Sequence, residues 1–200
     1  MRRAAQRQSS SRSPVEARRR EGSICRARQF TLRFFLMSPL KAGEMAPDFM
    51  LSGPDGTSFA LSALRTAPTL LVFYKNTCPT CILTLPFLQR LYERVEGSEV
   101  RFWGISQDSA AETRVFGEQY GITFPLLPDA SGYPVSNAYG ITTVPTLFLV
   151  EGDGSIARTH QGFSQTDLES LAAELRSRLR IAGVTPLFTP SDGVPLLRPG

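Results

Sequence analysis

Histidine, tryptophan and cysteine are scarce in this 200-residue chain, which contains one, one and three of them respectively. So few histidines and cysteines leave little choice of ligands for a zinc site, because structural zinc takes four. No run of about 18 or more apolar residues occurs, which excludes a transmembrane helix. Apolar residues still make up 42% of the chain, so we expect one globular domain with a sizeable core.

Positive charge is concentrated near the N-terminus. Residues 1–36 contain ten arginines and two glutamates, a local net charge of +8, whereas the whole chain has a formal net charge of +4. The remainder is therefore mildly acidic, at −4. Because it offers no basic surface, we expect no nucleic-acid partner for the domain.

Residues 1–37 form a leader that is rich in arginine and serine and poor in large apolar side chains, so we expect it to be disordered. Three interpretations are open: translation from a start upstream of the true one, an export signal, or a tether to nucleic acid or membrane. The apolar run from Phe30 to Met37 is short, is interrupted by Arg33 and lacks a small-residue cleavage site. We therefore expect a start at Met37 and a cytoplasmic protein, with export to the periplasm as the alternative.

Beyond Met37, strand-like and helix-like segments alternate. We expect strands at 48–51, 57–61, 68–74, 100–106, 123–127, 145–150 and 155–160, and helices at 79–95, 109–120, 133–139 and 166–181. Such alternation indicates an α/β fold with a central sheet covered on both faces. We assign residues 38–182 to this domain and 183–200 to a Pro-rich C-terminal tail, either a loosely packed strap or disordered.

Cys78 and Cys81 follow closely after the apolar segment 68–74. We expect Cys78 at the N-cap of the next helix and Pro79 at its first position, where the missing amide has no helical partner. A helix N-terminus stabilises a thiolate, which is the nucleophilic form of cysteine. Cys81, one turn further along, would be more buried and placed to resolve a mixed disulfide formed at Cys78.

Two other uses of this cysteine pair fit the sequence less well. Zinc would need two further ligands, and only Cys25 and His160 are available, neither of them in a second paired motif. A structural disulfide would close too short a loop to remove much denatured-state entropy. We therefore expect no metal and no other cofactor, and a redox role for the pair.

The stretch LLVFYKNTCPTC, with Pro86 five residues after the second cysteine, resembles the thioredoxin-superfamily active site. Thr143-Val144-Pro145-Thr146 resembles the cis-proline loop of that superfamily, which lies against the disulfide and pairs with the substrate backbone. Further stretches resemble the redoxin branch, which TlpA/ResA-like thiol-disulfide oxidoreductases share with AhpC/TSA peroxiredoxins; they are residues 41–51, 55–64, 103–108 and 139–156.

The resemblance implies a thioredoxin-like fold with a central mixed sheet, an N-terminal β-hairpin and an inserted βα unit. It implies a thiol-disulfide oxidoreductase in which Cys78 attacks and Cys81 resolves. Substrate contacts are expected at Val144, Pro145, Thr77 and Pro79. The partners would be a protein disulfide or a peroxide, together with an external reductant that recycles the dithiol.

Three departures from the family patterns matter for mechanism. Neither cysteine lies in the Pro-x-x-x-Thr-x-x-Cys motif of peroxiredoxins, so an atypical thiol peroxidase is an alternative. Val72 stands where thioredoxins have a buried aspartate, and Thr84 where TlpA-like proteins have a glutamate. The base for Cys81 is then open, with water, Thr77 or Thr84 as substitutes. A redox-inert binding module is the remaining alternative.

Overall fold

The computed structural model describes residues 38–64, 67–183 and 185–200, so the predicted leader and Cys25 lie outside the described residues. The elements follow the predicted order of strands and helices. They are β1 (Met50–Ser52), β2 (Ser58–Ala60), η1 (Leu61–Leu64), β3 (Thr69–Tyr74), α1 (Pro79–Val95), β4 (Arg101–Ser106), α2 (Ala110–Tyr120), β5 (Leu126–Pro128), α3 (Pro134–Ala138), β6 (Thr146–Val150), β7 (Ile156–Gln161), β8 (Phe163–Ser164), α4 (Gln165–Leu179), η2 (Pro190–Asp192) and β9 (Leu197–Arg198).

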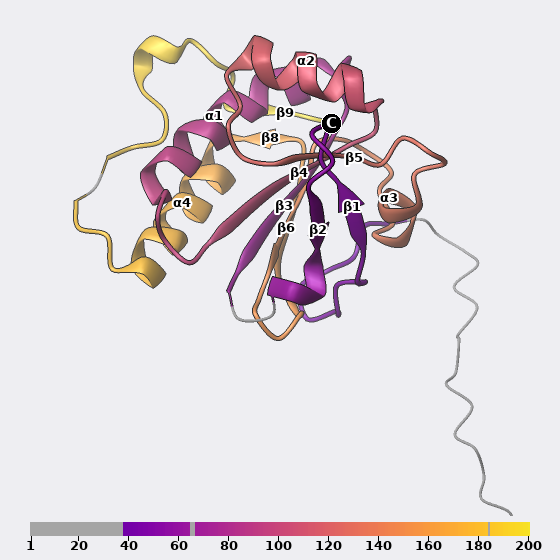
Figure 1. Ribbon diagram of the computed structural model, residues 1–200. Helices are drawn as coiled ribbons and strands as arrows, with labels where there is room; N and C mark the ends of the chain where they lie inside the picture. The colour runs from indigo at the N-terminus through magenta and orange to yellow at the C-terminus, as the bar shows by residue number, and fades with distance from the viewer. Residues whose placement is uncertain (1–37, 65–66, 184) are drawn as a thin grey trace, which may run out of the picture. The chain divides into compact units, whose positions relative to one another are not determined.

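The central sheet has five strands in the order β5-β4-β3-β6-β7 (Figure 1). β3 runs parallel to β4, and β4 parallel to β5, whereas β6 is antiparallel to both β3 and β7. β3 is buried along its whole length, as an unbroken apolar segment predicts for a central strand. The predicted α/β class with a mixed central sheet is confirmed.

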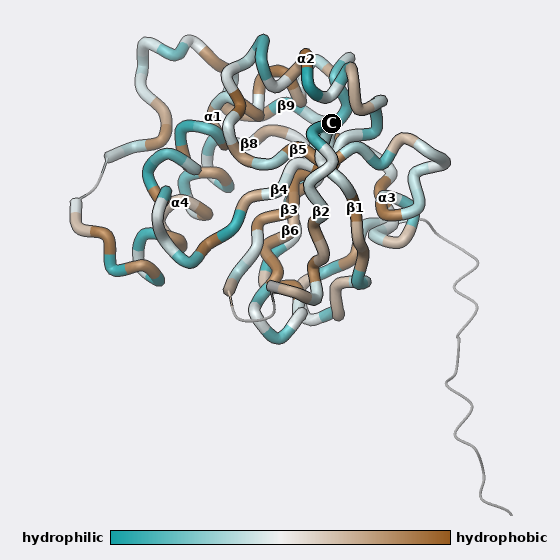
Figure 2. The backbone as a smooth tube through the Cα atoms, in the orientation of Figure 1, coloured by the Kyte–Doolittle hydropathy of each residue, from teal (hydrophilic) through white to brown (hydrophobic). Residues whose placement is uncertain are grey.

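Two apolar clusters cover the two faces of this sheet. In Figure 2 much of the backbone of the central strands has the brown colour of hydrophobic residues. On one face α1, α2 and α4 contribute Leu85, Leu88, Phe116, Leu168 and Leu171. On the other face the β1-β2 hairpin and α3 pack their apolar residues against Leu71, Phe73, Trp103, Ile105 and Phe148. Strand side chains alternate between the faces, which is why neighbouring residues of β3 belong to different clusters.

β5 is shorter than predicted. A strand was expected over 123–127, but pairing with β4 begins at Leu126, opposite Gly104. Pro125 immediately precedes it and has no amide hydrogen to donate to a ladder, although its carbonyl accepts from the Gly104 amide at 2.9 Å. The apolar residues before it, Ile122 and Phe124, are buried in the core without belonging to a strand.

Over the described residues 185–200, the C-terminal tail packs on the domain as a strap. Leu187 is completely buried, and the Phe188 ring packs against Phe87 and Phe163 at centroid distances of 4.4 and 5.6 Å. In Figure 1 this yellow segment loops past α4 and α1 and returns as β9 beside β8. The sequence of the tail has no hydrophobic period from which such packing could be inferred, because its buried apolar side chains, Leu187 and Phe188, are adjacent.

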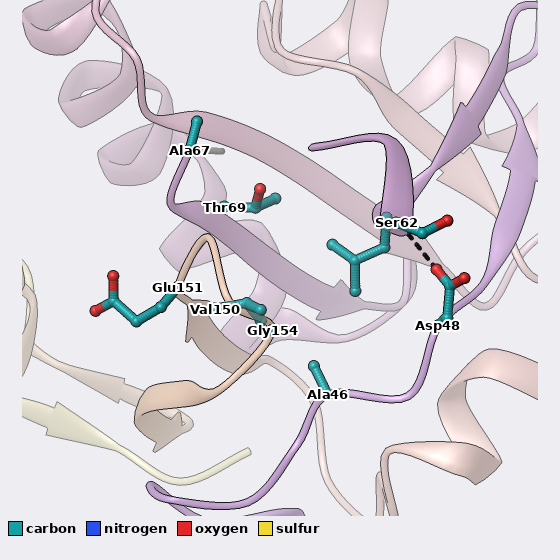
Figure 3. A pocket seen from close by; sticks show the side chains of 9 residues that line it. Ala46, Asp48, Ser62, Ala67, Thr69, Val150, Glu151 and Gly154 are labelled. Atoms are coloured by element: carbon teal, nitrogen blue, oxygen red, sulfur yellow. Dashed lines mark hydrogen bonds between the residues drawn. The ribbon is translucent and has the colours of Figure 1, made fainter. Parts of the chain in front are cut away.

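A small pocket lies at the opposite end of β3 from the cysteines (Figure 3). It is lined by residues that include Thr69, Val150 and Gly154, and the Asp48 carboxylate at its edge accepts a hydrogen bond from the Ser62 amide at 2.9 Å. Its volume of about 10 Å³ is no larger than one water needs. It is therefore too small and too distant from Cys78 to be the active site.

Candidate active site

The start of α1 holds Cys78 where the sequence predicted it. Cys78 is the N-cap with an extended backbone, Pro79 is the first helical residue, and the Cys78 sulfur accepts a hydrogen bond from the Cys81 amide at 3.3 Å. The Cys78 carbonyl accepts from the Ile82 amide at 3.0 Å, which begins the helical ladder. Cys78 is half-buried and lies at a helix N-terminus, where the first backbone amides have no helical partner.

The loop before β6 lies against this thiol. The Val144–Pro145 peptide bond is cis, as the resemblance implied. The Cys78 thiol donates to the Val144 carbonyl oxygen at 3.3 Å. Three hydrogen bonds hold the loop. The Pro145 carbonyl accepts from the Gly162 backbone amide at 2.8 Å, and the Thr143 carbonyl accepts from the Thr146 hydroxyl at 2.7 Å. The Thr143 hydroxyl donates to the Gln161 side-chain oxygen at 3.0 Å. Residues 66 positions apart therefore meet at one sulfur atom.

Cys81 is completely buried beneath Cys78, and both are free thiols. Burial raises the pKa of the Cys81 thiol well above its ordinary value, and the nearby Cys78 and Asp108 raise it further. The backbone of Lys75 acts in the opposite direction but is outweighed. Cys81 is accordingly a neutral thiol at neutral pH, so any attack by it needs a group that takes its proton.

Asp108 is a charged neighbour that the sequence analysis missed. Its carboxylate accepts hydrogen bonds from the Asn76 amide at 2.7 Å and the Ser106 hydroxyl at 3.4 Å. β3 and β4 are parallel with Tyr74 opposite Ser106, so the residues that follow these strands meet at one edge of the sheet. Asp108 belongs to a stretch that carried the family resemblance. Its position near Cys81 could be predicted only from the order of the strands in the sheet.

The other predicted residues lie around this thiol. Pro145 is buried behind Val144, whereas Thr77 and Pro79 are exposed on either side of Cys78. The Thr84 hydroxyl donates to the Thr80 carbonyl at 2.6 Å, so its hydrogen is committed to the helix backbone. Thr84 therefore does not replace the missing glutamate as an acid or base.

His160 lies apart from the cysteines. Its Nε2 lies 3.1 Å from the Gly162 carbonyl oxygen and its Nδ1 lies 3.3 Å from the Asp167 carboxylate. Burial lowers the pKa of His160, and Asp167 partly offsets this. Over 38–64, 67–183 and 185–200, no group of three or more His, Cys, Asp or Glu side chains is arranged to hold a metal ion.

Comparison with known proteins places this geometry in a family. Residues 42–159 match the AhpC/TSA family. The chain belongs to the AhpC/TSA family. The match covers the hairpin, the cysteine pair and the cis-proline loop, and it ends before α4 and the C-terminal tail.

Individual proteins and solved structures are also similar to this chain. The chain is 31% identical over 142 residues to the thiol-disulfide oxidoreductase ResA of Halalkalibacterium halodurans, covering 70% of this chain and 80% of ResA. A putative thiol:disulfide interchange protein DsbE from Chlorobium tepidum superposes with a TM-score of 0.64 at 26% identity, covering 70% and 99% of the two chains. Peroxidoxin BcpB from Mycobacterium tuberculosis gives a TM-score of 0.58 at 25% identity, covering 72% and 99%. The predicted redoxin branch of the thioredoxin superfamily is confirmed.

Proposed function

We propose that this protein is a thiol-disulfide oxidoreductase in which Cys78 is the nucleophile and Cys81 the resolving thiol. The observation that carries the proposal is the position of the Cys78 sulfur, which bonds both the Cys81 amide and the Val144 carbonyl at 3.3 Å. A half-exposed sulfur at a helix N-terminus, backed by a buried thiol one turn along, suits disulfide exchange. The ResA and DsbE relatives support it by their names.

The reaction balances with one dithiol and one substrate disulfide. The Cys78 thiolate attacks one sulfur of the substrate, the substrate S–S bond breaks, and the other sulfur leaves as a thiolate that takes a proton. Cys81, once deprotonated, attacks the Cys78 sulfur and releases the second substrate thiol. The substrate gains two electrons, the protein is left with a Cys78–Cys81 disulfide, and an external dithiol reductant restores it.

We further propose Asp108 as the proton acceptor for Cys81. Val72 and Thr84 stand where related proteins have the two carboxylates. The charge of Asp108 raises the pKa of the buried Cys81 thiol, so this carboxylate lies near it. The Asn76 amide holds the carboxylate in place at 2.7 Å. Asp108 is half-exposed, so a proton accepted there can pass to solvent.

The substrate class that fits this site is a protein disulfide. The cis-proline loop presents the Val144 backbone beside Cys78, and a main-chain contact recognises an extended polypeptide without regard to its sequence. Thr77 and Pro79 are exposed on the same surface and would contact the partner.

A trapping experiment tests these roles. The Cys81→Ser variant, made in a Cys25→Ser background, should accumulate a mixed disulfide with a disulfide-containing peptide, detected by intact mass. The Cys78→Ser variant in the same background should trap nothing. Trapping at Cys81 in the absence of Cys78, or equal trapping by both variants, would contradict the assignment.

Peroxidase activity is a second candidate, because BcpB is a structural neighbour and the family includes peroxiredoxins. The Pro-x-x-x-Thr-x-x-Cys motif is absent here, so we expect Cys78 to react with hydrogen peroxide no faster than glutathione does. A rate orders of magnitude faster would favour the peroxidase. A redox-inert binding module would instead keep its partner affinity unchanged in Cys78→Ser.

We propose a cytoplasmic location, supported by the short and interrupted apolar run 30–37. No helix among the described residues is both long and apolar enough to cross a membrane. Fractionation of cells that express the full chain, followed by N-terminal sequencing, tests this location. Recovery of a processed form outside the cytoplasm would overturn it.

A further inference from the structure

The last strand of the chain runs beside the cis-proline loop. β9 pairs antiparallel with β8, with Arg198 opposite Phe163. Gly162, which precedes β8, has a φ of +75°, and a β-carbon there would lie 2.8 Å from the Arg198 carbonyl oxygen. Only glycine permits this approach, and the same residue donates its amide to Pro145. The tail is therefore fitted closely along the substrate side of the loop.

The end of this strand reaches the residues around Cys78. The Thr80 hydroxyl, between the two cysteines, donates to the Pro199 carbonyl at 2.8 Å. Gly200 packs on the cis-proline loop: a β-carbon there would lie 2.7 Å from the Val144 carbonyl oxygen and 3.4 Å from the Thr143 side chain. That Val144 oxygen is the one that accepts from the Cys78 thiol. The tail thus lies where the backbone of a partner strand would need to lie.

We propose that residues 197–200 fill the strand-binding surface formed by Thr80, Val144 and β8, and that an extended polypeptide substrate binds by displacing them. This inference rests on the proposed function, because it concerns the partner of the same thiol. The segment lies outside the residues that match the family, 42–159, so it is a feature of this chain beyond the family match.

The tail has a firm anchor and a weakly held end. Leu187 and Phe188 are buried, and Arg90 bonds the Asp192 carboxylate at 3.0 and 3.1 Å. Every residue from 195 to 200 is exposed, with 77% of Leu196 and 68% of Leu197 accessible to solvent. Because almost no apolar surface is buried by the end, it can open at a smaller free energy than the anchor.

Hydrogen bonds are what hold the end in place. The Gln165 side chain donates to the Val194 and Pro195 carbonyls at 3.1 Å each. The Gln165 backbone amide donates to the Leu196 carbonyl at 3.0 Å. A substrate strand offers the same main-chain groups, so it can replace β9 without a particular sequence. A small disulfide has no strand to pair and does not need to displace the tail.

Hydrogen exchange on trapped complexes tests the displacement. Full-length Cys25→Ser/Cys81→Ser protein is joined through Cys78 either to cysteamine or to an eight-residue peptide with one central cysteine. We expect the amides of Leu196, Leu197, Arg198 and Gly200 to lose protection in the peptide complex only, while those of Phe188, Thr189 and Asp192 keep theirs. Unchanged protection in the peptide complex, or equal loss in both complexes, overturns the displacement. Failure to form either mixed disulfide overturns the proposed function instead, and with it this inference.

A kinetic comparison adds a matched pair of variants. Gln165→Ala removes the two side-chain hydrogen bonds to the tail, whereas Thr166→Ala changes an exposed neighbour whose side chain makes no hydrogen bond to the described tail residues. We expect Gln165→Ala to reduce a peptide disulfide about fivefold faster, as loss of roughly one net hydrogen bond allows, and a small aromatic disulfide at an unchanged rate. Thr166→Ala should leave both rates unchanged. Equal acceleration with both substrates, or none with the peptide, overturns the proposal.

Discussion

Thr80 donates its hydroxyl hydrogen to the carbonyl oxygen of Pro199 across 2.8 Å, and this bond ties the helix that carries both cysteines to the end of the chain. Thr80 is only 4% exposed, so its hydroxyl has little access to solvent as an alternative partner. The two residues are 119 positions apart. The end of the C-terminal strap is therefore in direct contact with the active-site turn.

Replacing Thr80 with valine should release the end of the strap. Valine has a similar volume but cannot donate, so the Pro199 carbonyl loses its partner. We expect increased hydrogen exchange at the amides of Leu197, Arg198 and Gly200, with a loss of about 0.5–1.5 kcal/mol in the free energy of unfolding by urea. Thr80→Ser keeps the hydroxyl and should behave like the parent. Faster exchange throughout α1 in Thr80→Val would instead indicate damage to the helix itself.

The pH dependence of the resolving step should reveal the base. The pKa of Cys81 is raised by burial, so without a base its thiolate fraction would rise about tenfold per pH unit through neutrality. If Asp108 accepts the proton, the step does not depend on hydroxide, and the rate should rise much less than tenfold per pH unit. Stopped-flow measurement of substrate thiol release from the mixed disulfide reads this rate directly.

Asp108→Asn distinguishes proton transfer from simple electrostatics. If Asp108 is the base, its removal should slow the resolving step at neutral pH by roughly 10²-fold or more. The rate should then rise about tenfold per pH unit. If Asp108 acts only as a repulsive charge, its removal lowers the pKa of Cys81 and resolution becomes faster. Glu112→Gln, an exposed carboxylate on α2, serves as the control and should change neither the rate nor its pH profile.

The start of α1 could be predicted from residues close together in the sequence. The contacts between distant residues could not be predicted in this way. Cys78 at the N-cap and Pro79 at the first helical position follow from backbone chemistry within a few residues. Asp108 could not be assigned, because its approach to Cys81 depends on β3 and β4 being parallel neighbours in register. The resemblance gave the cis Val144–Pro145 bond, which no local pattern specifies.

The tail was the least predictable part of the chain. It is held by Leu187 in the core, by the Arg90–Asp192 ion pair and by the pairing of β8 with β9. The first two contacts join residues that are distant in sequence, and the third joins strands of only two residues each. A segment with four prolines and no period gives no sign of such contacts. The predicted boundary at 182 stays a prediction, although the strap packs on the domain.

Leu187→Ala should destabilise the domain as a core substitution does. Its side chain is completely buried, so we expect a loss of about 2–4 kcal/mol in the free energy of unfolding by urea. Leu197→Ala removes the same atoms from a side chain that is 68% exposed and should change stability by less than about 0.5 kcal/mol. Equal effects of the two variants would contradict the division into anchor and displaceable end.

Alkaline pH should destabilise the reduced protein through Cys81. The pKa of Cys81 is higher in the folded than in the unfolded chain. Its contribution to the free energy of unfolding is therefore fully present below the ordinary pKa of 9.0 and is lost as the pH rises above that value. One such group removes up to about 1.4 kcal/mol per pH unit. Urea unfolding of the reduced protein at pH 8, 9 and 10 should show a smaller decline in Cys81→Ala than in the parent. Identical declines would mean that Cys81 ionises as readily in the folded chain as in the unfolded one.

The most direct measurement of the central claim is a redox titration of the full-length protein in glutathione and dithiothreitol buffers, with the disulfide located by peptide mass mapping. The account predicts one reversible disulfide between Cys78 and Cys81, formed and reduced with the loss and gain of two hydrogen atoms. A pair that stays reduced in every buffer, or a disulfide that joins Cys25 in its place, would contradict it.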